Sequence, residues 1–476
     1  MTEPCDRDAI ELRRQIGAGE LSPVDLVESC IARIEEANPT VNAITATAFE
    51  RARAEAREAE AAVRRGDPLG PLHGLPIGIK DLSETEGLRT TYGSPLFADH
   101  VPPADERVVA VLRRAGAIVL AKTNTPEFGA GANTRNEVFG PTRNPFDPRL
   151  TCGGSSGGSA AALACGMFPL ATGSDLAGSL RTPAAFCGVV GFRPTPGAIP
   201  TETRGHAWSP LSVDGPMART VADVALMLSV MVGDDPRDPL SLGIEGGPFR
   251  HLEAPDLSTL TAAFTEDLGF APVDDRVRHA FRAAQHALEP AFAHRASFTV
   301  DMTGVDRAFA TLRAVSFVAA HREKVEDTPD RVGPNVTANV AAGLALGLRD
   351  VAEALTVQTR VLRDADAFLD GVDVVICPVA GHPPFPWEDW YPAAMNGAKL
   401  SSYFHWLALA YGPTFAGLPS VALPFGRDAA GLPFGLQIIG RRRGDRAVLS
   451  AAYAIETWAR QRGFGRPVPE RRSQRT

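Results

Sequence analysis

Helical stripes and short continuous apolar runs alternate along the chain. A first helix is predicted to begin at Ser22 and Pro23, because serine suits the N-cap and proline suits the first helical position. The apolar residues that follow recur at the spacing of one helix face, and they are Leu26, Val27, Cys30, Ile31 and Ile34. We expect Asn38-Pro39 to end this helix. A second helix over residues 47–65 carries little large apolar surface and should lie on the outside.

Short apolar runs bounded by turn residues predict buried strands. One covers residues 74–81 and includes Lys80, which is either a surface side chain at the sheet edge or a lysine held inside. Another covers residues 117–120 after a helix over 108–116, and the polar Lys122-Thr123-Asn124 that follows should form a loop. Further strands are expected over 374–377 and, as a pair, over 419–424 and 434–440, and further helices over 222–231, 277–293, 345–369 and 447–458. This helix–strand alternation is typical of an α/β fold.

Residues 151–193 concentrate glycine, serine and small apolar residues. Glycine lets a backbone approach a ligand closely and lets several N–H groups point at it together. A flexible linker would have such a composition, but strongly apolar sequence follows the run at once. A phosphate-binding loop would need a Gly-Lys-Ser/Thr that is absent. A nucleophile elbow around Ser155 would need a hydrophobic strand before it, whereas RNPFDPRLT is rich in proline and charge.

Aromatic side chains gather in one late segment of a chain in which only 7% of residues are aromatic. They are Trp387, Trp390, Tyr391, Tyr403, Phe404 and Trp406. Because proline, aspartate and glycine are interleaved with them, this cluster is either part of the core or the lining or lid of a pocket.

Composition and charge exclude several classes of protein. With 44% hydrophobic and 22% charged residues, the chain resembles ordinary globular proteins. No apolar run approaches the roughly 20 residues of a membrane span, and no signal-peptide core is visible, so we expect a cytoplasmic protein that does not bind membranes. The net charge of −8 provides no basic stripe for nucleic acid, and the C-terminal PERRSQRT should be a solvated tail. The six cysteines lack metal-site and disulfide spacings, and we expect neither a metal nor a cofactor.

A serine hydroxyl beside clustered N–H groups can attack a carbonyl carbon when a base removes its proton. None of the ten histidines lies in a glycine-rich or strand-end context that would suggest a Ser-His-Asp triad. Lys80 is the better candidate, because burial lowers the pKa of a lysine and its neutral amine accepts protons near neutral pH. Ser155 would then pass a proton from Ser179 to Lys80.

Four segments carry a combined pattern: GLPIGIKD around Lys80, AKTNTPEF over 121–128, NPFDPRLTCGGSSGGSAAA over 144–162 and GSDLAGSLRTPAAFCGVVGFRPT over 173–195. Together they resemble the amidase signature family. Segments near both ends of the chain are also similar to the family, and the sequence separation of 24 from Ser155 to Ser179 matches its spacing between bridging serine and nucleophile. The resemblance implies one α/β domain over residues 1–476, built on a single large mixed β-sheet with helices on both faces. Its parts would be N-terminal helices over 1–70, a signature core over 71–235 and a more variable region over 244–400 that shapes the substrate pocket.

The resemblance also implies roles for single residues. Ser179 would attack the carbonyl carbon, and Lys80 would be the final base. Ser155, which follows a cis peptide bond in this family, would relay the proton of Ser179 to Lys80. Ser174 matches a position whose hydroxyl lies near the catalytic lysine.

The segment around Ser179 matches the family's oxyanion hole, whose N–H groups would come from Leu176, Ala177, Gly178 and Ser179. Asp175 and Arg181 flank this segment and should hold it in place. The sequence departs from the common pattern at Ala177, where glycine is expected and a methyl group restricts the backbone.

The expected function is hydrolysis of a small aliphatic or aryl amide, or of a carbamate, by an enzyme that acts alone. Its partner would be a small-molecule amide, and a homodimer is left open. The substrate pocket is expected to include Asn124, Trp208, Trp387, Tyr403 and Trp406. Two alternatives remain: the amidase subunit of a tRNA-dependent glutamine amidotransferase and a catalytically silent binding homologue.

Overall fold

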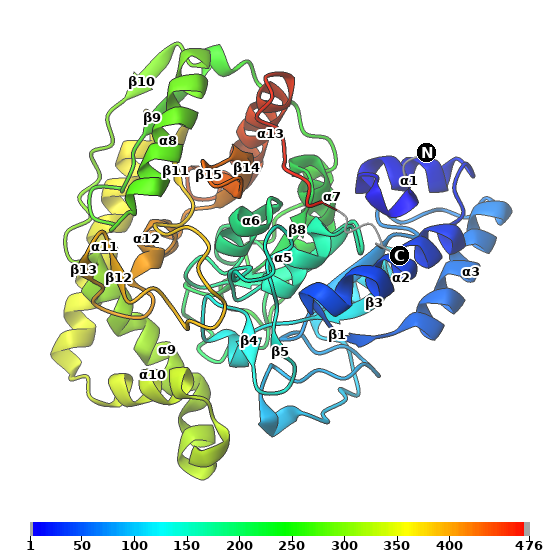
Figure 1. Ribbon diagram of the computed structural model, residues 1–476, viewed down its shortest axis with the longest axis horizontal. Coiled ribbons are helices and arrows are strands. Elements are labelled where there is room, and N and C mark those ends of the chain that lie inside the picture. Colours follow the sequence, from blue (N-terminus) through cyan, green and yellow to red (C-terminus); the bar gives the residue numbers. More distant parts are fainter. Residues whose placement is uncertain (1–2, 471–476) are drawn as a thin grey trace.

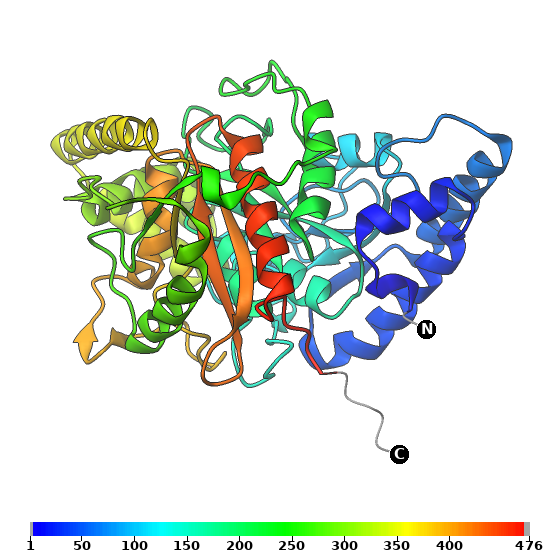
Figure 2. The ribbon, with the colours of Figure 1, turned by 90° about the horizontal axis from the view of Figure 1, so that it is seen from above.

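A large mixed β-sheet with helices on both faces organises residues 3–470, the part of the chain that the computed structural model describes (Figures 1 and 2). Eleven strands of this part form the sheet in the order β1-β3-β2-β6-β8-β7-β14-β15-β11-β9-β10. In chain order they are β1 (Ile44–Thr47), β2 (Pro76–Lys80), β3 (Ile118–Thr123), β6 (Leu170–Asp175), β7 (Val190–Arg193), β8 (Val213–Ala218), β9 (Thr261–Phe264), β10 (His294–Ala296), β11 (Val374–Pro378), β14 (Ser420–Arg427) and β15 (Pro433–Ile439). The fold class expected from the sequence is confirmed.

Helices surround this sheet. They are α1 (Ala9–Gly17), α2 (Pro23–Val41), α3 (Phe49–Arg65), α4 (Arg107–Arg114), α5 (Gly157–Ala164), α6 (Arg181–Cys187), α7 (Val221–Met231), α8 (Asp275–Leu288), α9 (Val305–Asp327), α10 (Pro334–Leu344), α11 (Leu348–Leu369), α12 (Ala408–Phe415) and α13 (Asp445–Gln461). Two short hairpins pair β4 (Arg135–Asn136) with β5 (Gly140–Pro141) and β12 (Ala394–Met395) with β13 (Ala398–Lys399). Helices α1 to α3 lie at one end of the molecule, and α9 to α11 lie at the other (Figure 1). No described helix has the length and apolar character that crossing a membrane requires.

The direction of the strands places the polar ends of three of them together. β2 pairs in parallel with both β3 and β6, so the three strands end at the same edge of the sheet. Lys80, Thr123 and Asp175 are the last residues of these strands. Residues that follow them are therefore neighbours, which is how parallel sheets assemble sites at the carboxyl ends of their strands.

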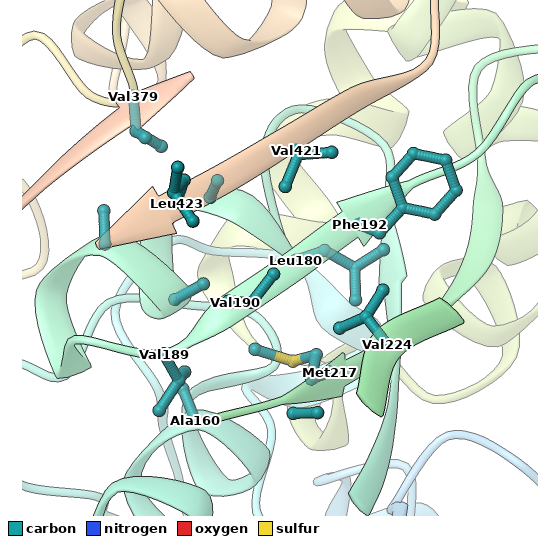
Figure 3. Close-up of a cluster of buried hydrophobic side chains, with 14 of the residues drawn as sticks. Ala160, Leu180, Val189, Val190, Phe192, Met217, Val224, Val379, Val421 and Leu423 are labelled. Carbon is teal, nitrogen blue, oxygen red and sulfur yellow. The ribbon is translucent and has the colours of Figure 1, made fainter. Parts of the chain in front are cut away.

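Large apolar side chains fill the middle of the sheet and the space beneath its helices. Figure 3 shows part of this core, in which Phe192 of β7, Met217 of β8 and Val421 of β14 lie near one another and are fully buried. Ala160 of α5 and Val224 of α7 join the same cluster. The small side chains of α5 allow this helix to pack closely, and every residue of α5 is buried.

The predicted start of the first long helix is confirmed, because the Ser22 hydroxyl accepts a hydrogen bond from the Val24 N–H. Its predicted end was wrong. Helix α2 continues through Pro39 to Val41, and it closes where the Asn42 N–H donates to the Asn38 carbonyl at 2.7 Å. A proline in the last turn removes one N–H only, so it does not stop the helix where it stands.

The expected loop at Lys122-Thr123 is instead the end of strand β3. Lys122 pairs with Ala46 of β1 and Ile79 of β2, and its ammonium is fully buried. The group donates to the hydroxyls of Thr85 and Thr90 at 3.0 and 2.9 Å and to the Ser83 carbonyl. The polar side chain therefore has buried partners, which an interpretation based on polarity alone does not reveal.

Several other boundaries differ from the sequence expectations. Residue 47 belongs to β1, so the second helix starts later, and the helices expected over 277–293 and 345–369 are shorter than predicted. Strands β7 and β8 and helices α9 and α10 were not predicted. The expected C-terminal tail from residue 471 onward lies outside the described residues.

Candidate active site

A cavity of about 590 Å³ lies beyond the carboxyl ends of β2 and β6. Ser155, Ser174 and Ser179 are all part of its wall, together with Leu176 and Ala177 from the segment after β6. The residues that the sequence singled out in its glycine- and serine-rich stretch are therefore brought together around one space.

Lys80 lies behind this wall, and its side chain is 1% exposed. Its Nζ is 2.7 Å from the Ser155 Oγ, 2.9 Å from the Ser156 Oγ and 2.9 Å from the Ser174 Oγ. The backbone holds the lysine as well, because its N–H donates to the Thr172 hydroxyl on the neighbouring strand. The sequence allowed Lys80 to be either a surface side chain at the sheet edge or a buried one, and in the structure it is buried.

The charge state of Lys80 follows from its surroundings. Burial lowers the pKa of its ammonium to about 7, and the carboxylates of Asp214 and Asp175 offset part of that effect. No described carboxylate forms an ion pair with it. Both the charged and the neutral amine are therefore populated near neutral pH.

The neighbouring serines differ in what they can do with a proton. The Ser156 hydroxyl donates to the Ser174 carbonyl at 3.3 Å, so toward Lys80 it acts as an acceptor. The Ser155 hydroxyl has Lys80 as its one hydrogen-bond partner among the described residues, and it is free to give its proton to the neutral amine. The peptide bond between Gly154 and Ser155 is cis, as the family resemblance implied.

Ser179 sits beside this pair on the loop that joins β6 to α6. Its carbonyl accepts a hydrogen bond of 3.1 Å from the Ser156 N–H, which ties the two serine-containing segments together. Its side chain is half-buried and lines the cavity. Within the described residues its hydroxyl makes no hydrogen bond, so the Oγ is available to a molecule in the cavity.

Asp175 and Arg181 form hydrogen bonds with each other and with the loop between β6 and α6. The Asp175 carboxylate accepts two hydrogen bonds from Arg181, at 2.9 and 2.8 Å, and two from the backbone N–H groups of Gly178 and Leu180. Burial alone would raise the pKa of Asp175, but the guanidinium groups of Arg181 and Arg193 outweigh it and hold that pKa well below its usual range. The carboxylate of Asp175 is therefore negatively charged near neutral pH, and it binds the backbone of the loop through Gly178 and Leu180.

The set of N–H groups open to an oxyanion differs from the expected one. The Gly178 N–H donates to Asp175 at 2.9 Å, and Gly178 does not line the cavity. The N–H groups of Leu176, Ala177 and Ser179 have no acceptor among the described residues, and all three residues line the cavity. Gly178 has the left-handed φ of 105°, whereas Ala177 is not among the residues with positive φ. Alanine therefore fits at position 177.

The expected pocket residues separate into two groups. Tyr403 lines the cavity, and Trp406 is buried behind it, with its indole N–H donating to the Tyr403 carbonyl at 3.1 Å. Trp208 is 71% exposed and Trp387 lies against Arg143, and neither lines the cavity. Asn124 is fully buried in hydrogen bonds to the 140–142 segment and lies outside the cavity as well.

Two carboxyl groups in the cavity wall were missed by the sequence analysis. Asp214 lies on β8 directly opposite Ser174, and its carboxylate accepts a hydrogen bond from the Thr201 hydroxyl at 3.1 Å. Glu106, just before α4, accepts from the Glu84 N–H at 3.1 Å. Burial raises the pKa of both groups, that of Glu106 to about 8. Neither residue stands in a motif, so only the pairing of β6 with β8 reveals Asp214.

Potential metal ligands gather elsewhere. Among residues 3–470, one group of three such side chains could reach a common ion, and it consists of Glu3, Cys5 and Asp6. Arg33 pairs with both carboxylates of that group. None of these residues lines the cavity described above.

Comparisons with known proteins give a consistent result. A sequence profile of the family described as Amidase matches residues 25–449. An acylamidase of Rhodococcus erythropolis is 35% identical over 459 residues, which cover 95% of this chain and 96% of that protein. A glutamyl-tRNA(Gln) amidotransferase subunit of Thermosynechococcus vestitus is 33% identical over 471 residues, which cover 94% of this chain and 96% of that one. The crystal structure of a bacterial aryl acylamidase of the amidase signature family superposes with a TM-score of 0.88 at 28% identity, over 97% of this chain and 99% of the other.

Proposed function

The chain belongs to the amidase signature family, and from that membership we propose that it hydrolyses a small aliphatic or aryl amide through an acyl-enzyme on Ser179. Membership over residues 25–449 makes it an amide hydrolase that acts on carbon–nitrogen bonds. The observation that supports the acyl-enzyme mechanism is the hydrogen bond of 2.7 Å between the buried Lys80 Nζ and the Ser155 Oγ. Ser155 lies in the wall of the cavity that Ser179 also lines.

The first half of the reaction uses the hydroxyl and amine groups in sequence. The Ser179 Oγ attacks the carbonyl carbon while its proton passes to the Ser155 Oγ, and the Ser155 proton passes to the neutral Lys80 Nζ. The oxygen of the tetrahedral intermediate receives hydrogen bonds from the free N–H groups beside Ser179. When the carbon–nitrogen bond breaks, the proton returns through Ser155 to the leaving amine.

The second half repeats these steps with water. A water molecule loses its proton along the same path and attacks the acyl-enzyme, and the Ser179 Oγ leaves with the returned proton. Ser156 and Ser174 keep two N–H groups of Lys80 engaged at 2.9 Å each. The lone pair of the neutral amine is thereby directed at Ser155.

The proposal is tested by Ser179→Ala. Because the hydroxyl has no protein partner among the described residues, we expect an unchanged melting temperature and a fall in kcat of roughly 10³-fold or more on an aryl amide. Ser209→Ala is a matched control, since Ser209 also lines the cavity but lies outside the Lys80 network. Retention of more than a tenth of the wild-type kcat in Ser179→Ala would count against the acyl-enzyme.

A second candidate is the amidase subunit of a tRNA-dependent amidotransferase, because relatives named as glutamyl-tRNA(Gln) amidotransferase subunits are 32 to 34% identical to the chain over most of its length. Such a protein would release ammonia from glutamine and would depend on other subunits. Measuring ammonia release from glutamine beside hydrolysis of primary amides, anilides and carbamates by the pure chain separates the two. Turnover of anilides without glutaminase activity supports the first candidate, and the reverse result supports the second.

A further inference from the structure

Helix α9 contributes one face to the wall of the catalytic cavity. Arg313, Phe317, Ala320 and Lys324 recur on it at helical spacing, and all four line the cavity. Figure 1 shows α9 beside α10, and the two helices pack against each other. The mechanism proposed above uses none of these side chains.

Arg313 is the buried cation of this face, with 5% of the residue exposed. Its Nη1 donates to the Asn339 Oδ1 on α10, and its Nη2 donates to the Tyr403 hydroxyl. Three aromatic rings surround the guanidinium carbon, which lies 4.4 Å from the ring centre of Phe317, 4.8 Å from that of Phe404 and 5.3 Å from that of Tyr403. The orientation of the guanidinium is therefore fixed before any ligand arrives.

No described carboxylate pairs with Arg313. Other arginines near the cavity have a carboxylate partner: Arg181 and Arg193 share Asp175, and Arg204 pairs with Asp238. Arg313 has only neutral oxygens as partners, and within residues 3–470 three of its five N–H groups donate to no protein acceptor. A guanidinium enclosed by aromatic rings without an anion is costly, and a negatively charged ligand in the cavity would remove that cost.

Tyr403 offers a second donor at the same place. Its hydroxyl oxygen accepts hydrogen bonds from Arg313 and, at 2.8 Å, from the Asn339 Nδ2. Since both partners donate, the hydroxyl proton has no acceptor among the described residues, although the residue lines the cavity.

We propose that Arg313 and the hydroxyl of Tyr403 bind a carboxylate of the substrate, so that the preferred substrates are amides that also carry a free carboxylate. This inference rests on the proposed function of the same cavity. One guanidinium with one neutral donor matches a monoanion, and the planar edge of a guanidinium suits the two oxygens of a carboxylate. The surrounding rings exclude water and strengthen the contact.

The test compares matched substrates that differ in one carboxylate. Succinic acid mono-4-nitroanilide is compared with butyric acid 4-nitroanilide, and 4-acetamidobenzoate with 4-acetamidotoluene, which place the carboxylate on the acyl and the amine side respectively. We expect the carboxylated member of at least one pair to have a kcat/KM roughly 10- to 100-fold higher, as hydrogen bonds to a charged group provide. Equal kcat/KM values within both pairs would overturn the proposal.

Variants assign the preference to its residues. Arg313→Met should abolish this preference, so that kcat/KM falls roughly 10- to 100-fold more for the carboxylated substrate than for its neutral counterpart, and Tyr403→Phe should weaken the preference by roughly tenfold. Lys324→Met is the matched control, because Lys324 lies on the same helix face and donates to the Ala320 carbonyl, and it should leave the preference unchanged. An equal loss for both substrates in Arg313→Met, or loss of the preference in Lys324→Met, would contradict the proposal. If Arg313→Met does not fold, Arg313→Lys takes its place; it keeps the charge but loses the planar edge, so the preference should weaken without disappearing, and an unchanged preference would contradict the proposal.

A binding experiment separates this inference from the proposed function. Ser179→Ala is titrated calorimetrically with 4-acetamidobenzoate and succinic acid mono-4-nitroanilide, and the titrations are repeated with Arg313→Met added. Binding of either compound that is lost in the double variant supports the carboxylate site even if the wild type hydrolyses neither. Turnover of neutral anilides without Arg313-dependent binding of either anion supports the proposed function and overturns the carboxylate site.

Discussion

Lys80 has three hydroxyl neighbours, and their hydrogen bonds favour Ser155 as the one that exchanges a proton with it. Ser156 acts as an acceptor toward Lys80 because its own hydroxyl donates to the Ser174 carbonyl, whereas Ser155 and Ser174 both line the cavity. Of the two hydroxyls that line the cavity, that of Ser155 makes the shorter contact with the Lys80 Nζ, at 2.7 Å compared with 2.9 Å for Ser174. At the residue scale, the direction of proton transfer therefore follows from the hydrogen-bond pattern.

The pH dependence of the reaction follows from the pKa of Lys80, which burial lowers to about 7. Only the neutral amine accepts a proton, so kcat/KM should rise with pH, fall about tenfold per unit well below pH 7, and level off above it. Steady-state kinetics between pH 5 and 9 with a neutral anilide measure this profile. A profile that is flat below pH 7, or that falls as the pH rises through 7, would contradict a lysine base.

Asp214 should adjust that profile, because its negative charge favours the ammonium form of Lys80. Asp214→Asn removes the charge, so the pKa of Lys80 should fall and the rising part of the profile should move to lower pH. Asp330→Asn, an exposed aspartate outside the cavity, removes the same charge as a control and should leave the profile in place. A shift of the Asp214→Asn profile to higher pH would disprove this coupling.

At the scale of elements, the loop between β6 and α6 depends on a glycine at one position. Gly178 has a φ of 105°, and a Cβ there would lie 2.5 Å from the Ala410 Cβ and 3.0 Å from the Thr182 hydroxyl. Ala177 next to it has no such conformation. The departure from the family pattern at position 177 is therefore compatible with a working loop.

Exchanging alanine and glycine in opposite directions at positions 177 and 178 tests this loop. Gly178→Ala should lower the free energy of unfolding by about 1–3 kcal/mol and reduce kcat at least tenfold, because the loop must move to make room for the methyl group. Ala177→Gly should keep kcat within severalfold and lower stability by no more than about 1 kcal/mol. Urea denaturation and anilide turnover measure both variants. A Gly178→Ala enzyme with wild-type kcat would show that the loop tolerates a side chain there.

The elements that the sequence predicted well are those whose residues carry local signals. Ser22 and Pro23 mark a helix start, and the apolar run before Lys80 marks a strand. The predictions at Lys122 and Pro39 were wrong because the buried partners of Lys122 lie elsewhere in the fold and because Pro39 stands in the last turn of its helix. Local patterns contain neither kind of information.

At the scale of the whole molecule, Arg181 joins parts of the chain that are far apart in sequence. Besides Asp175 it donates to the Ala410 carbonyl and the Thr414 hydroxyl of α12, and to the Gln437 amide oxygen of β15. The loop that carries Ser179 is thus fixed to a helix and a strand that come more than 200 residues later.

Removing the hydrogen bonds of Arg181 should lower the free energy of unfolding. Arg181→Met leaves the buried Asp175 carboxylate with fewer partners, and we expect a loss of about 3–5 kcal/mol in the free energy of unfolding together with loss of activity. Arg149→Met is the control, since Arg149 forms an exposed pair with Asp147, and its unfolding curve should match that of the wild type. Guanidinium chloride denaturation followed by circular dichroism compares the two. Similar curves for both variants would mean that the junction does not stabilise the fold.

Ser155, Ser179 and Lys80 could be proposed as catalytic residues from the sequence because they lie in motifs with a specific spacing. Arg313 could not be proposed as a binding residue, because it lies in an ordinary helical pattern. Its hydrogen-bond partners come from α10 and from Tyr403, which only the fold brings next to α9. The aromatic residues show the same limit, since Tyr403 lines the cavity whereas Trp208 is exposed. Which side of an element faces the cavity is decided by tertiary packing.

The central claim is that Ser179 forms the covalent intermediate, and mass spectrometry of the quenched enzyme tests it most directly. During turnover of a 4-nitrophenyl ester of a small acid, acid quenching followed by proteolysis should reveal the mass of the acyl group on the peptide that contains Ser179. Ser179→Ala should carry no adduct, and in Lys80→Met the adduct should form far more slowly. An acyl group found on Ser155 or Ser156 would contradict this mechanism. Turnover without any detectable acyl-enzyme would contradict it as well, under conditions in which hydrolysis of the intermediate limits the rate and the intermediate should accumulate.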